Sequence, residues 1–170
     1  MKTLDVKRIR IAFDEQWRVA LAWDEGPAYR HGLGRLQGTK AVDVIALDAE
    51  TCWLIEMKDF RGHRIENRGR VGPALAEEVA AKVRDTIAAL VWTQGRAECP
   101  AEPELTRFLK VLLNQGARTG PIKVVLWLDQ DRQAPAASAV AELIKRELKP
   151  WLDVRVIVTS TPGQECWKTS

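Results

Sequence analysis

Three charged residues, Asp43, Glu56 and Lys58, stand at the start of or inside two apolar segments of the chain. Carboxylate oxygens are hard ligands of the kind that Mg²⁺ and Mn²⁺ prefer. A lysine beside such an ion can orient or deprotonate a water molecule, or neutralise charge that develops on a phosphorus centre. Together these residue types supply what metal-assisted hydrolysis of a phosphodiester needs.

The two apolar segments around these residues predict a β-hairpin. Four residues, Asp48 to Thr51, separate the segments, and this is a common length for a hairpin loop. Side chains two positions apart point to the same face of a strand, so Glu56 and Lys58 project together. Asp43 heads the partner strand, and antiparallel neighbours lie about 5 Å apart. The hairpin therefore predicts that the three charged groups share one small volume.

A second reading of the pattern is an ordinary ion pair on an edge strand. The tripeptide Glu-x-Lys is common, and it occurs again from Glu147 to Lys149 in a predicted surface helix, where it has no catalytic meaning. The pair at Glu56 and Lys58 differs because apolar, β-prone residues surround it and Asp43 heads the neighbouring strand. We therefore favour a metal site.

The chain ahead of the hairpin predicts more β-structure and then a loop. Residues 6–23 alternate apolar and polar side chains, which predicts a first β-hairpin. We interpret its stripe of tryptophans, Trp17 and Trp23, as core packing rather than as a surface that stacks nucleic-acid bases. The glycine-rich segment 24–41 predicts a mobile loop beside the site, in which Lys40 is available to bind phosphate.

The second half of the chain predicts helices that alternate with strands. Three segments have apolar residues at intervals of three and four, whereas two short, β-branched runs are typical of buried strands. The predicted helices are 73–94, 103–115 and 136–149, and the predicted strands are 122–128 and 154–158. The tail after the last strand has no clear signal. We expect an α/β (α+β) fold, with a mixed central sheet built on an antiparallel hairpin and about three flanking helices.

Length and charge predict one globular domain, residues 1–170, with cations concentrated in one segment. Hydrophobic residues make up 46% and charged residues 29% of the chain, which is ordinary for a globular protein. The net charge of +3 is too small to indicate a nucleic-acid binder by itself. Segment 58–70, however, holds five basic and two acidic residues. Its arginines favour a phosphate-binding arm over a solvated loop; they are Arg61, Arg64, Arg68 and Arg70.

The cysteines and the hydropathy pattern predict a reduced, cytoplasmic protein that does not associate with membranes. Cys52, Cys99 and Cys166 are far apart and form no C-x-x-C motif, so neither a zinc knuckle nor a disulfide framework is indicated. The sequence has no signal-peptide pattern and no apolar run of transmembrane length.

The central motif resembles the PD-(D/E)xK nuclease superfamily. Asp43 is followed, after twelve residues, by Glu56-Met57-Lys58 on an apolar strand, and the superfamily also builds its core on a hairpin and a mixed sheet. The resemblance implies a restriction-endonuclease-like fold in which Asp43, Glu56 and the main-chain carbonyl of Met57 hold Mg²⁺ or Mn²⁺. It also implies that Lys58 serves the attacking water.

The resemblance covers residues 43–58 as a motif and extends to about residue 158 as a predicted topology. Val42 stands where the superfamily has its namesake proline. Many members carry a further acid on an early helix, whereas this chain predicts a hairpin there. Glu15 and Glu25 are the candidates for that acid.

We therefore expect a metal-dependent nuclease that acts on nucleic acid, with DNA ahead of RNA, in repair, recombination, restriction or phage defence. The alternatives are a nuclease-like module that binds nucleic acid or protein without cutting, and a structural subunit with a charged edge strand. The sequence contains no helix-turn-helix or zinc module for reading bases. A partner protein or a second copy of the chain could supply specificity.

Overall fold

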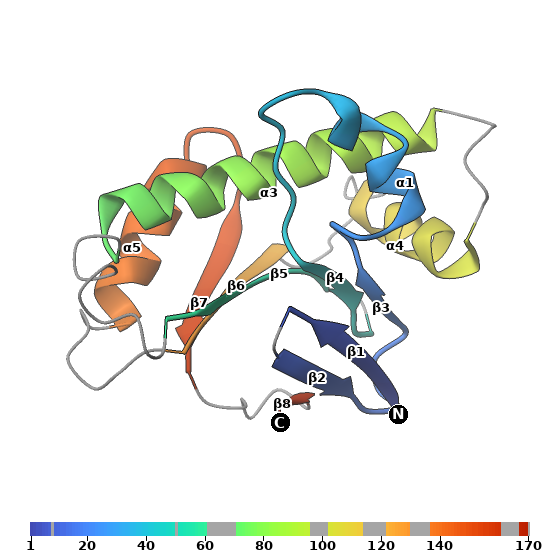
Figure 1. The fold of residues 1–170 in the computed structure, drawn as a ribbon, viewed down its shortest axis with the longest axis horizontal. Helices are drawn as coiled ribbons and strands as arrows, with labels where there is room; N and C mark the ends of the chain where they lie inside the picture. The colour runs from blue at the N-terminus through green and yellow to red at the C-terminus, as the bar shows by residue number, and fades with distance from the viewer. Residues whose placement is uncertain are drawn as a thin grey trace.

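The computed structural model describes residues 1–7, 9–49, 51–60, 71–95, 102–113, 122–129, 137–160 and 167–169. These residues form a mixed α/β fold in three layers (Figure 1). A five-stranded sheet is the middle layer. Helices pack on one of its faces, and a three-stranded antiparallel sheet packs on the other.

The middle sheet is mixed, as the sequence predicts. Its strand order is β3 (Val19–Ala22), β4 (Val44–Leu47), β5 (Cys52–Asp59), β6 (Ile122–Asp129) and β7 (Val154–Thr159). The first three strands are antiparallel, whereas β5, β6 and β7 are parallel. Val44 pairs with Ile55 and Leu47 pairs with Cys52, so the predicted central hairpin and its four-residue loop are confirmed.

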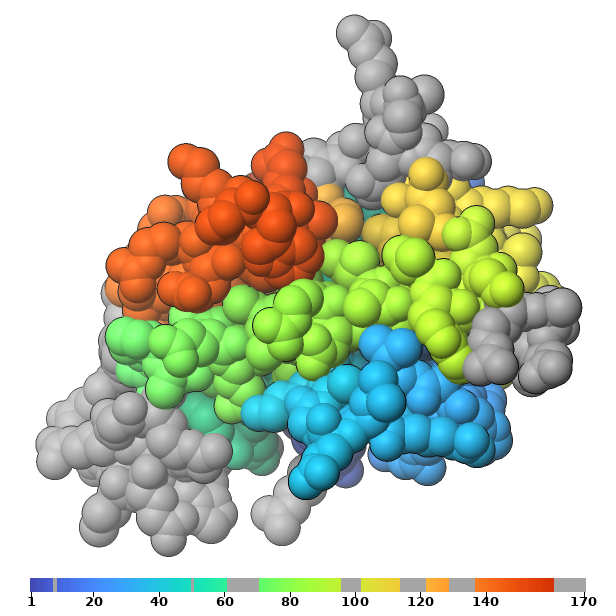
Figure 2. All heavy atoms as spheres, turned by 90° about the horizontal axis from the view of Figure 1, so that it is seen from above, coloured from blue at the N-terminus to red at the C-terminus, as the bar shows by residue number. Residues whose placement is uncertain are grey.

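The helical layer consists of α3 (Pro73–Gln94), α4 (Pro103–Leu113) and α5 (Ala137–Leu148), close to the predicted ranges. The apolar stripe of α3 includes Leu75, Val79 and Val83, which are buried against the sheet. Seen from above, α3 runs between α5 on one side and the segment 24–42 on the other (Figure 2).

The segment 24–41, predicted as a mobile loop, contains two short helical turns. These are α1 (Pro27–Arg30) and a 3-10 turn, η1 (Leu33–Arg35). Gly32 lies between them and allows a close approach to α3, because a Cβ there would stand 2.4 Å from the Trp92 ring. Proline and glycine therefore shape this segment against α3 instead of leaving it as an open loop.

The predicted hairpin over residues 6–23 is wrong in its pairing. Ile9–Phe13 (β2) and Val19–Ala22 (β3) are both strands, but β2 pairs with β1 (Lys2–Val6) and with β8 (Trp167–Thr169) in the small sheet. The strand β3 joins the central sheet beside β4. Alternation identifies a strand and its buried face but does not identify its partner, and this explains the error.

The small sheet covers the sheet face opposite the helices. Ile11 and Phe13 are completely buried there. The Trp17 ring lies 5.2 Å from the Phe13 ring and 5.2 Å from the Trp53 ring, both edge to face, so the predicted core role of this tryptophan is confirmed. Among the helices that the structure describes, none has the length and apolarity to cross a membrane.

Candidate active site

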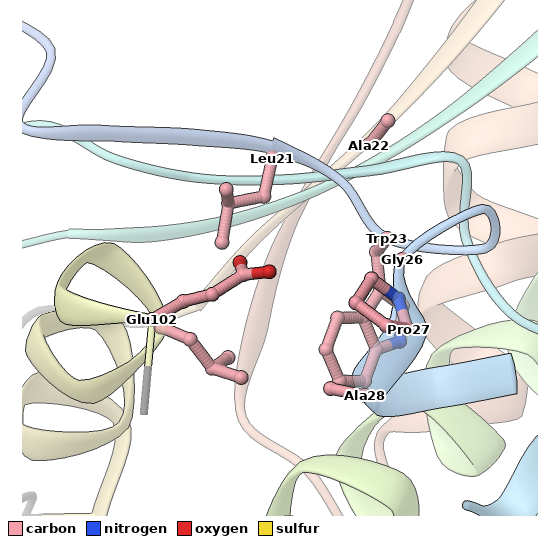
Figure 3. A pocket seen from close by; sticks show the side chains of 8 residues that line it. Leu21, Ala22, Trp23, Gly26, Pro27, Ala28 and Glu102 are labelled. Atoms are coloured by element: carbon pink, nitrogen blue, oxygen red, sulfur yellow. The ribbon is translucent and has the colours of Figure 1, made fainter. Parts of the chain in front are cut away.

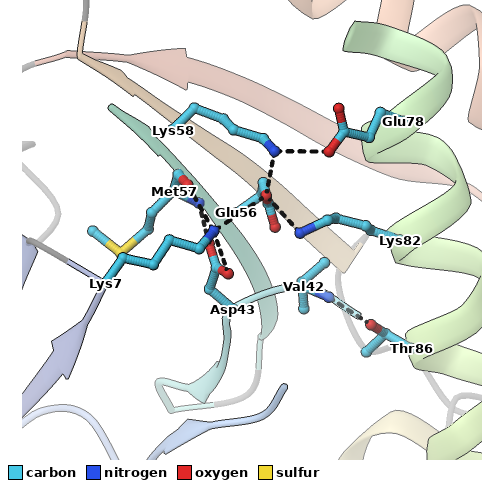
Figure 4. A network of polar contacts seen from close by, with 9 residues as sticks. All are labelled: Lys7, Val42, Asp43, Glu56, Met57, Lys58, Glu78, Lys82 and Thr86. Carbon is cyan, nitrogen blue, oxygen red and sulfur yellow. Dashed lines mark hydrogen bonds and ion pairs between the residues drawn. The ribbon is translucent and has the colours of Figure 1, made fainter. Parts of the chain in front are cut away.

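The site lies just beyond the last residue pair of the β4–β5 hairpin, where β5 continues without β4 beside it. The last pair of the β4–β5 ladder is Val44 with Ile55, and β5 continues beyond it to Asp59. The Met57 N–H donates a hydrogen bond to Asp43 Oδ2 over 2.7 Å, and the Met57 carbonyl accepts one from Lys7 Nζ over 3.2 Å (Figure 4). Beyond the end of β4, the side chains of Asp43 and Lys7 therefore form the hydrogen bonds to the main chain of Met57.

Helix α3 holds the backbone that leads into Asp43. The Val42 N–H donates to Thr86 Oγ1 over 3.0 Å, and the Lys40 N–H donates to Asp85 Oδ2 over 3.1 Å. Thr86 is completely buried and Asp85 is nearly so. Because these bonds anchor the chain to a helix packed on the sheet, the Asp43 carboxylate has a defined position.

Glu56 points to the helical face of the sheet and is completely buried. Its Oε1 lies 2.7 Å from Lys82 Nζ on α3 and 3.3 Å from Lys58 Nζ on β5. Lys58 also donates to Glu78 on α3 over 2.7 Å. The Glu56–Lys58 proximity predicted from the strand period is confirmed. The other oxygen, Glu56 Oε2, is buried without a hydrogen-bond partner among the described residues.

One lysine ammonium group joins the two buried carboxylates. Lys7 Nζ lies 2.7 Å from Asp43 Oδ1, 3.0 Å from Asp43 Oδ2 and 3.8 Å from Glu56 Oε1. Asp43 is as completely buried as Glu56. We call Lys7, Asp43, Glu56, Lys58, Glu78 and Lys82 the charged cluster. Sequence reasoning identified Asp43, Glu56 and Lys58, and it missed Lys7, Glu78 and Lys82.

Burial and neighbouring charge shift the pKa values of the cluster. Burial, and then the charge of Asp43, raise the pKa of Glu56. Burial acts to lower the pKa of Lys58, but the carboxylates of Glu56 and Glu78 outweigh it and raise that pKa. Burial acts to raise the pKa of Glu78, but its hydrogen bond with Lys58 and the charges of Lys58 and Lys40 outweigh burial. The pKa of Glu78 is therefore lowered. Lys40 is thus close enough to act electrostatically on the cluster.

A further acid acts on Asp43 from the segment after β3. Burial, and then the charge of Asp43, raise the pKa of Asp24 to about 6. The two upstream acids proposed from the sequence, Glu15 and Glu25, are both exposed. Asp24 stands next to Glu25 in the chain and is the upstream carboxylate that the structure brings into electrostatic contact with the site.

The donor set at Asp43, Glu56 and Met57 fits a divalent cation. Among the described residues, no three or more His, Cys, Asp or Glu side chains are grouped so as to hold a metal ion. The two buried carboxylates and the Met57 carbonyl nevertheless surround one cationic nitrogen, Lys7 Nζ, and Glu56 Oε2 has no hydrogen-bond partner among the described residues. Oxygen donors of this kind, completed by water, suit Mg²⁺ or Mn²⁺. The arginines of segment 61–70 lie outside the described residues.

A separate pocket lies between β3, α1 and the start of α4 (Figure 3). Its volume is about 180 Å³, and its lining includes Leu21, Trp23, Pro27 and Leu105. Of the described residues in that lining, Glu102 alone is ionisable, and no member of the charged cluster contributes to it. The pocket is therefore not part of the candidate active site.

The chain is similar to part of one curated protein. It is 28% identical over 180 residues to a cysteine–tRNA ligase of Neisseria meningitidis serogroup A, serotype 4A, in a match that covers 88% of this chain and 25% of the ligase. The chain thus spans about a quarter of the length of that relative. No protein-family model matches the chain. No solved structure gives a significant match.

Proposed function

We propose that this chain is a metal-dependent nuclease of the PD-(D/E)xK type that hydrolyses phosphodiester bonds, with DNA as its first candidate substrate. One observation carries the proposal. The buried carboxylates of Asp43 and Glu56 and the carbonyl of Met57 converge on a single cationic position, and Lys58 lies beside Glu56. Buried charges without a task are costly, so such a convergence favours a functional site.

The order of elements supports a restriction-endonuclease-like fold. An antiparallel run of β3, β4 and β5 carries the motif. The chain then crosses over through α3 and α4 before β6 pairs in parallel with β5. The proposed catalytic strand, β5, is therefore the central strand of five and lies under α3. This agrees with the hairpin-based mixed sheet that the resemblance implies.

Each residue of the site has a distinct role in this proposal. Asp43, Glu56 and the Met57 carbonyl would hold the ion, which when bound polarises the scissile phosphate and favours hydroxide at neutral pH. Lys58 is held as an ammonium ion between Glu56 and Glu78, so it donates hydrogen bonds to the attacking water or to a phosphate oxygen. Lys82 holds Glu56 Oε1 and so orients that carboxylate.

A module that binds without cutting is the second candidate, and one observation favours it. Lys7, Lys58 and Lys82 already place three ammonium groups around the two buried carboxylates. Such a cluster could stabilise the fold without a metal ion. The two candidates differ in whether a divalent ion enters the cluster and whether cleavage follows.

The similarity to part of a cysteine–tRNA ligase bears on the choice of substrates. It gives no direct evidence for cleavage, but it justifies testing a transfer RNA beside DNA. A substrate panel should therefore contain supercoiled and linear duplex DNA, single-stranded DNA and a folded transfer RNA, each with Mg²⁺, with Mn²⁺ and with EDTA.

The test compares the motif with its copy elsewhere in the chain. Glu56→Gln and Lys58→Met should abolish cleavage, because they remove a proposed metal ligand and the proposed donor to water. Glu147→Gln and Lys149→Met alter the same Glu-x-Lys tripeptide outside the cluster and should cleave like the wild type. Cleavage that resists EDTA, or that survives Glu56→Gln, would exclude the proposed chemistry. Binding without cleavage of any substrate would support the second candidate.

A further inference from the structure

Lys7 occupies the position that the proposed metal ion would need. Its ammonium nitrogen contacts Asp43 Oδ1 at 2.7 Å and the Met57 carbonyl at 3.2 Å, and it lies 3.8 Å from Glu56 Oε1. These three groups are the donors that the proposed function assigns to Mg²⁺ or Mn²⁺. Figure 4 shows the lysine reaching them from the side opposite α3. A divalent ion and this ammonium group cannot occupy that position together.

The backbone at Lys7 is not what a lysine prefers. Val6 pairs with Ile9, so a two-residue turn joins β1 to β2, and Lys7 is its first residue. The φ angle of Lys7 is 55°, and no other non-glycine residue in the described part of the chain has a positive φ. Turns of this length favour asparagine or glycine at such positions. The turn therefore does not explain why a lysine stands at position 7. The contacts of its side chain with Asp43 and Met57 do explain it.

Lys7 is more exposed than the other two lysines of the cluster and is held by a shorter element of structure. Its side chain is 49% exposed, whereas those of Lys58 and Lys82 are 16% and 12% exposed. Lys58 and Lys82 belong to the long elements β5 and α3, but Lys7 stands at a hairpin tip. Withdrawing Lys7 into solvent would disturb little packing, so it is the lysine of the three that can leave.

We propose that Lys7 is an internal competitor for the metal site: its ammonium group fills the position between Asp43, Glu56 and the Met57 carbonyl in the metal-free protein and withdraws when Mg²⁺ or Mn²⁺ binds. Lys7 thereby sets the metal affinity, and metal loading is coupled to the tip of the β1–β2 hairpin. This inference rests on the proposed metal site and adds a residue that controls its occupancy.

The test is a titration of metal-free protein with Mn²⁺ by isothermal calorimetry, which does not depend on activity. Lys7→Met keeps the aliphatic stem and removes the competing charge, so it should bind Mn²⁺ at least tenfold more tightly than the wild type. Lys7→Arg keeps a cation and should bind no more tightly than the wild type. Lys2→Met is the matched control, because Lys2 lies on the same hairpin and pairs with Glu104 away from the cluster. It should leave the affinity unchanged.

Thermal unfolding provides a second readout, including for a variant of reduced stability. Lys7→Met should unfold at a lower temperature than the wild type in EDTA, because buried Asp43 loses its cation, and Mn²⁺ should raise its melting temperature by more than it raises that of the wild type. If wild type and Lys7→Met bind Mn²⁺ equally, or if the variant binds more weakly, the competitor role is refuted while the metal site stands. If neither protein binds Mn²⁺, the metal site itself is refuted and the competitor role with it.

Discussion

The N–H of Met57 and the carboxylate of Asp43 are joined by a buried hydrogen bond of 2.7 Å that takes the place of a strand-to-strand bond. The same carboxylate contacts Lys7 at 2.7 Å. Asp43 therefore completes the hairpin and also contributes to the candidate metal site. Its structural and chemical roles can be separated by choosing substitutions that preserve one of them.

Replacing Asp43 should lower stability by an amount that depends on the replacement. Asp43→Ala leaves the Met57 N–H and Lys7 without their partner, and we expect a loss of about 3 kcal/mol in the free energy of unfolding in EDTA. Asp43→Asn retains an acceptor and should cost less. The measurement is urea denaturation. Asp5→Ala is the control, since its pair with Arg10 is exposed to solvent and should contribute much less to stability. Equal losses for Asp43→Ala and Asp5→Ala would contradict the assigned role.

Lys82 and Glu56 should show strong coupling. Lys82→Met leaves the buried Glu56 carboxylate with weaker compensation, and we expect it to destabilise the protein by about 3 kcal/mol. Glu56→Gln removes the buried charge, so the double variant should be less destabilised than the sum of the two single variants by at least about 1 kcal/mol. A double-mutant cycle measured by urea denaturation in EDTA tests this coupling. Additive losses would show that the 2.7 Å contact contributes little.

Part of the site could be predicted because it is local in the sequence. The period of two places Glu56 and Lys58 on one face, and the four-residue loop places Asp43 opposite them. The strands and helices of the second half follow from apolar runs and from intervals of three and four. These patterns lie within single elements or between adjacent ones, so the sequence reveals them directly.

The missed residues reach the site through long-range packing. Lys82 lies four residues after Glu78 on α3, a spacing that places both on one side of the helix. Only the crossing of α3 over β5 brings Lys82 to Glu56 and Glu78 to Lys58. Lys7 arrives from a different sheet, whose pairing of β2 with β1 and β8 the alternating pattern could not determine. The place of Lys7 in a tight turn becomes visible only with the pairing of β1 and β2, so the sequence alone provides no local signal for this residue.

Asp24 should make stability depend on pH. Its folded-state pKa is about 6 against an ordinary 3.8, so the native protein binds this proton more tightly than the unfolded chain does. This contribution to stability is therefore present at acid pH and is lost as the pH rises between about 4 and 6. Asp24→Asn should flatten that part of the curve. The measurement is the free energy of unfolding as a function of pH in EDTA for both proteins, and identical curves would refute the shifted pKa.

The arginines of segment 61–70 should control the salt dependence of nucleic-acid binding. They follow the end of β5 closely in the sequence, so we expect them to contact phosphates near the site without reading bases. Replacing Arg61, Arg64, Arg68 and Arg70 with glutamine should flatten the plot of log affinity against log salt by about 0.9 per lost contact to duplex DNA. The control replaces four exposed cations of α4 and the α5 region, Arg107, Lys110, Arg146 and Lys149. Equal slopes for the wild type and the arm variant would exclude the arm as a phosphate-binding element.

The most direct test of the metal site is a crystal structure of the protein soaked in Mn²⁺, with anomalous scattering used to locate the ion. We predict an anomalous peak bounded by the Asp43 carboxylate, the Glu56 carboxylate and the Met57 carbonyl, with the Lys7 ammonium group displaced from all three. A map with no anomalous peak at this position at saturating Mn²⁺, and with Lys7 still bonded to Asp43, would contradict the account.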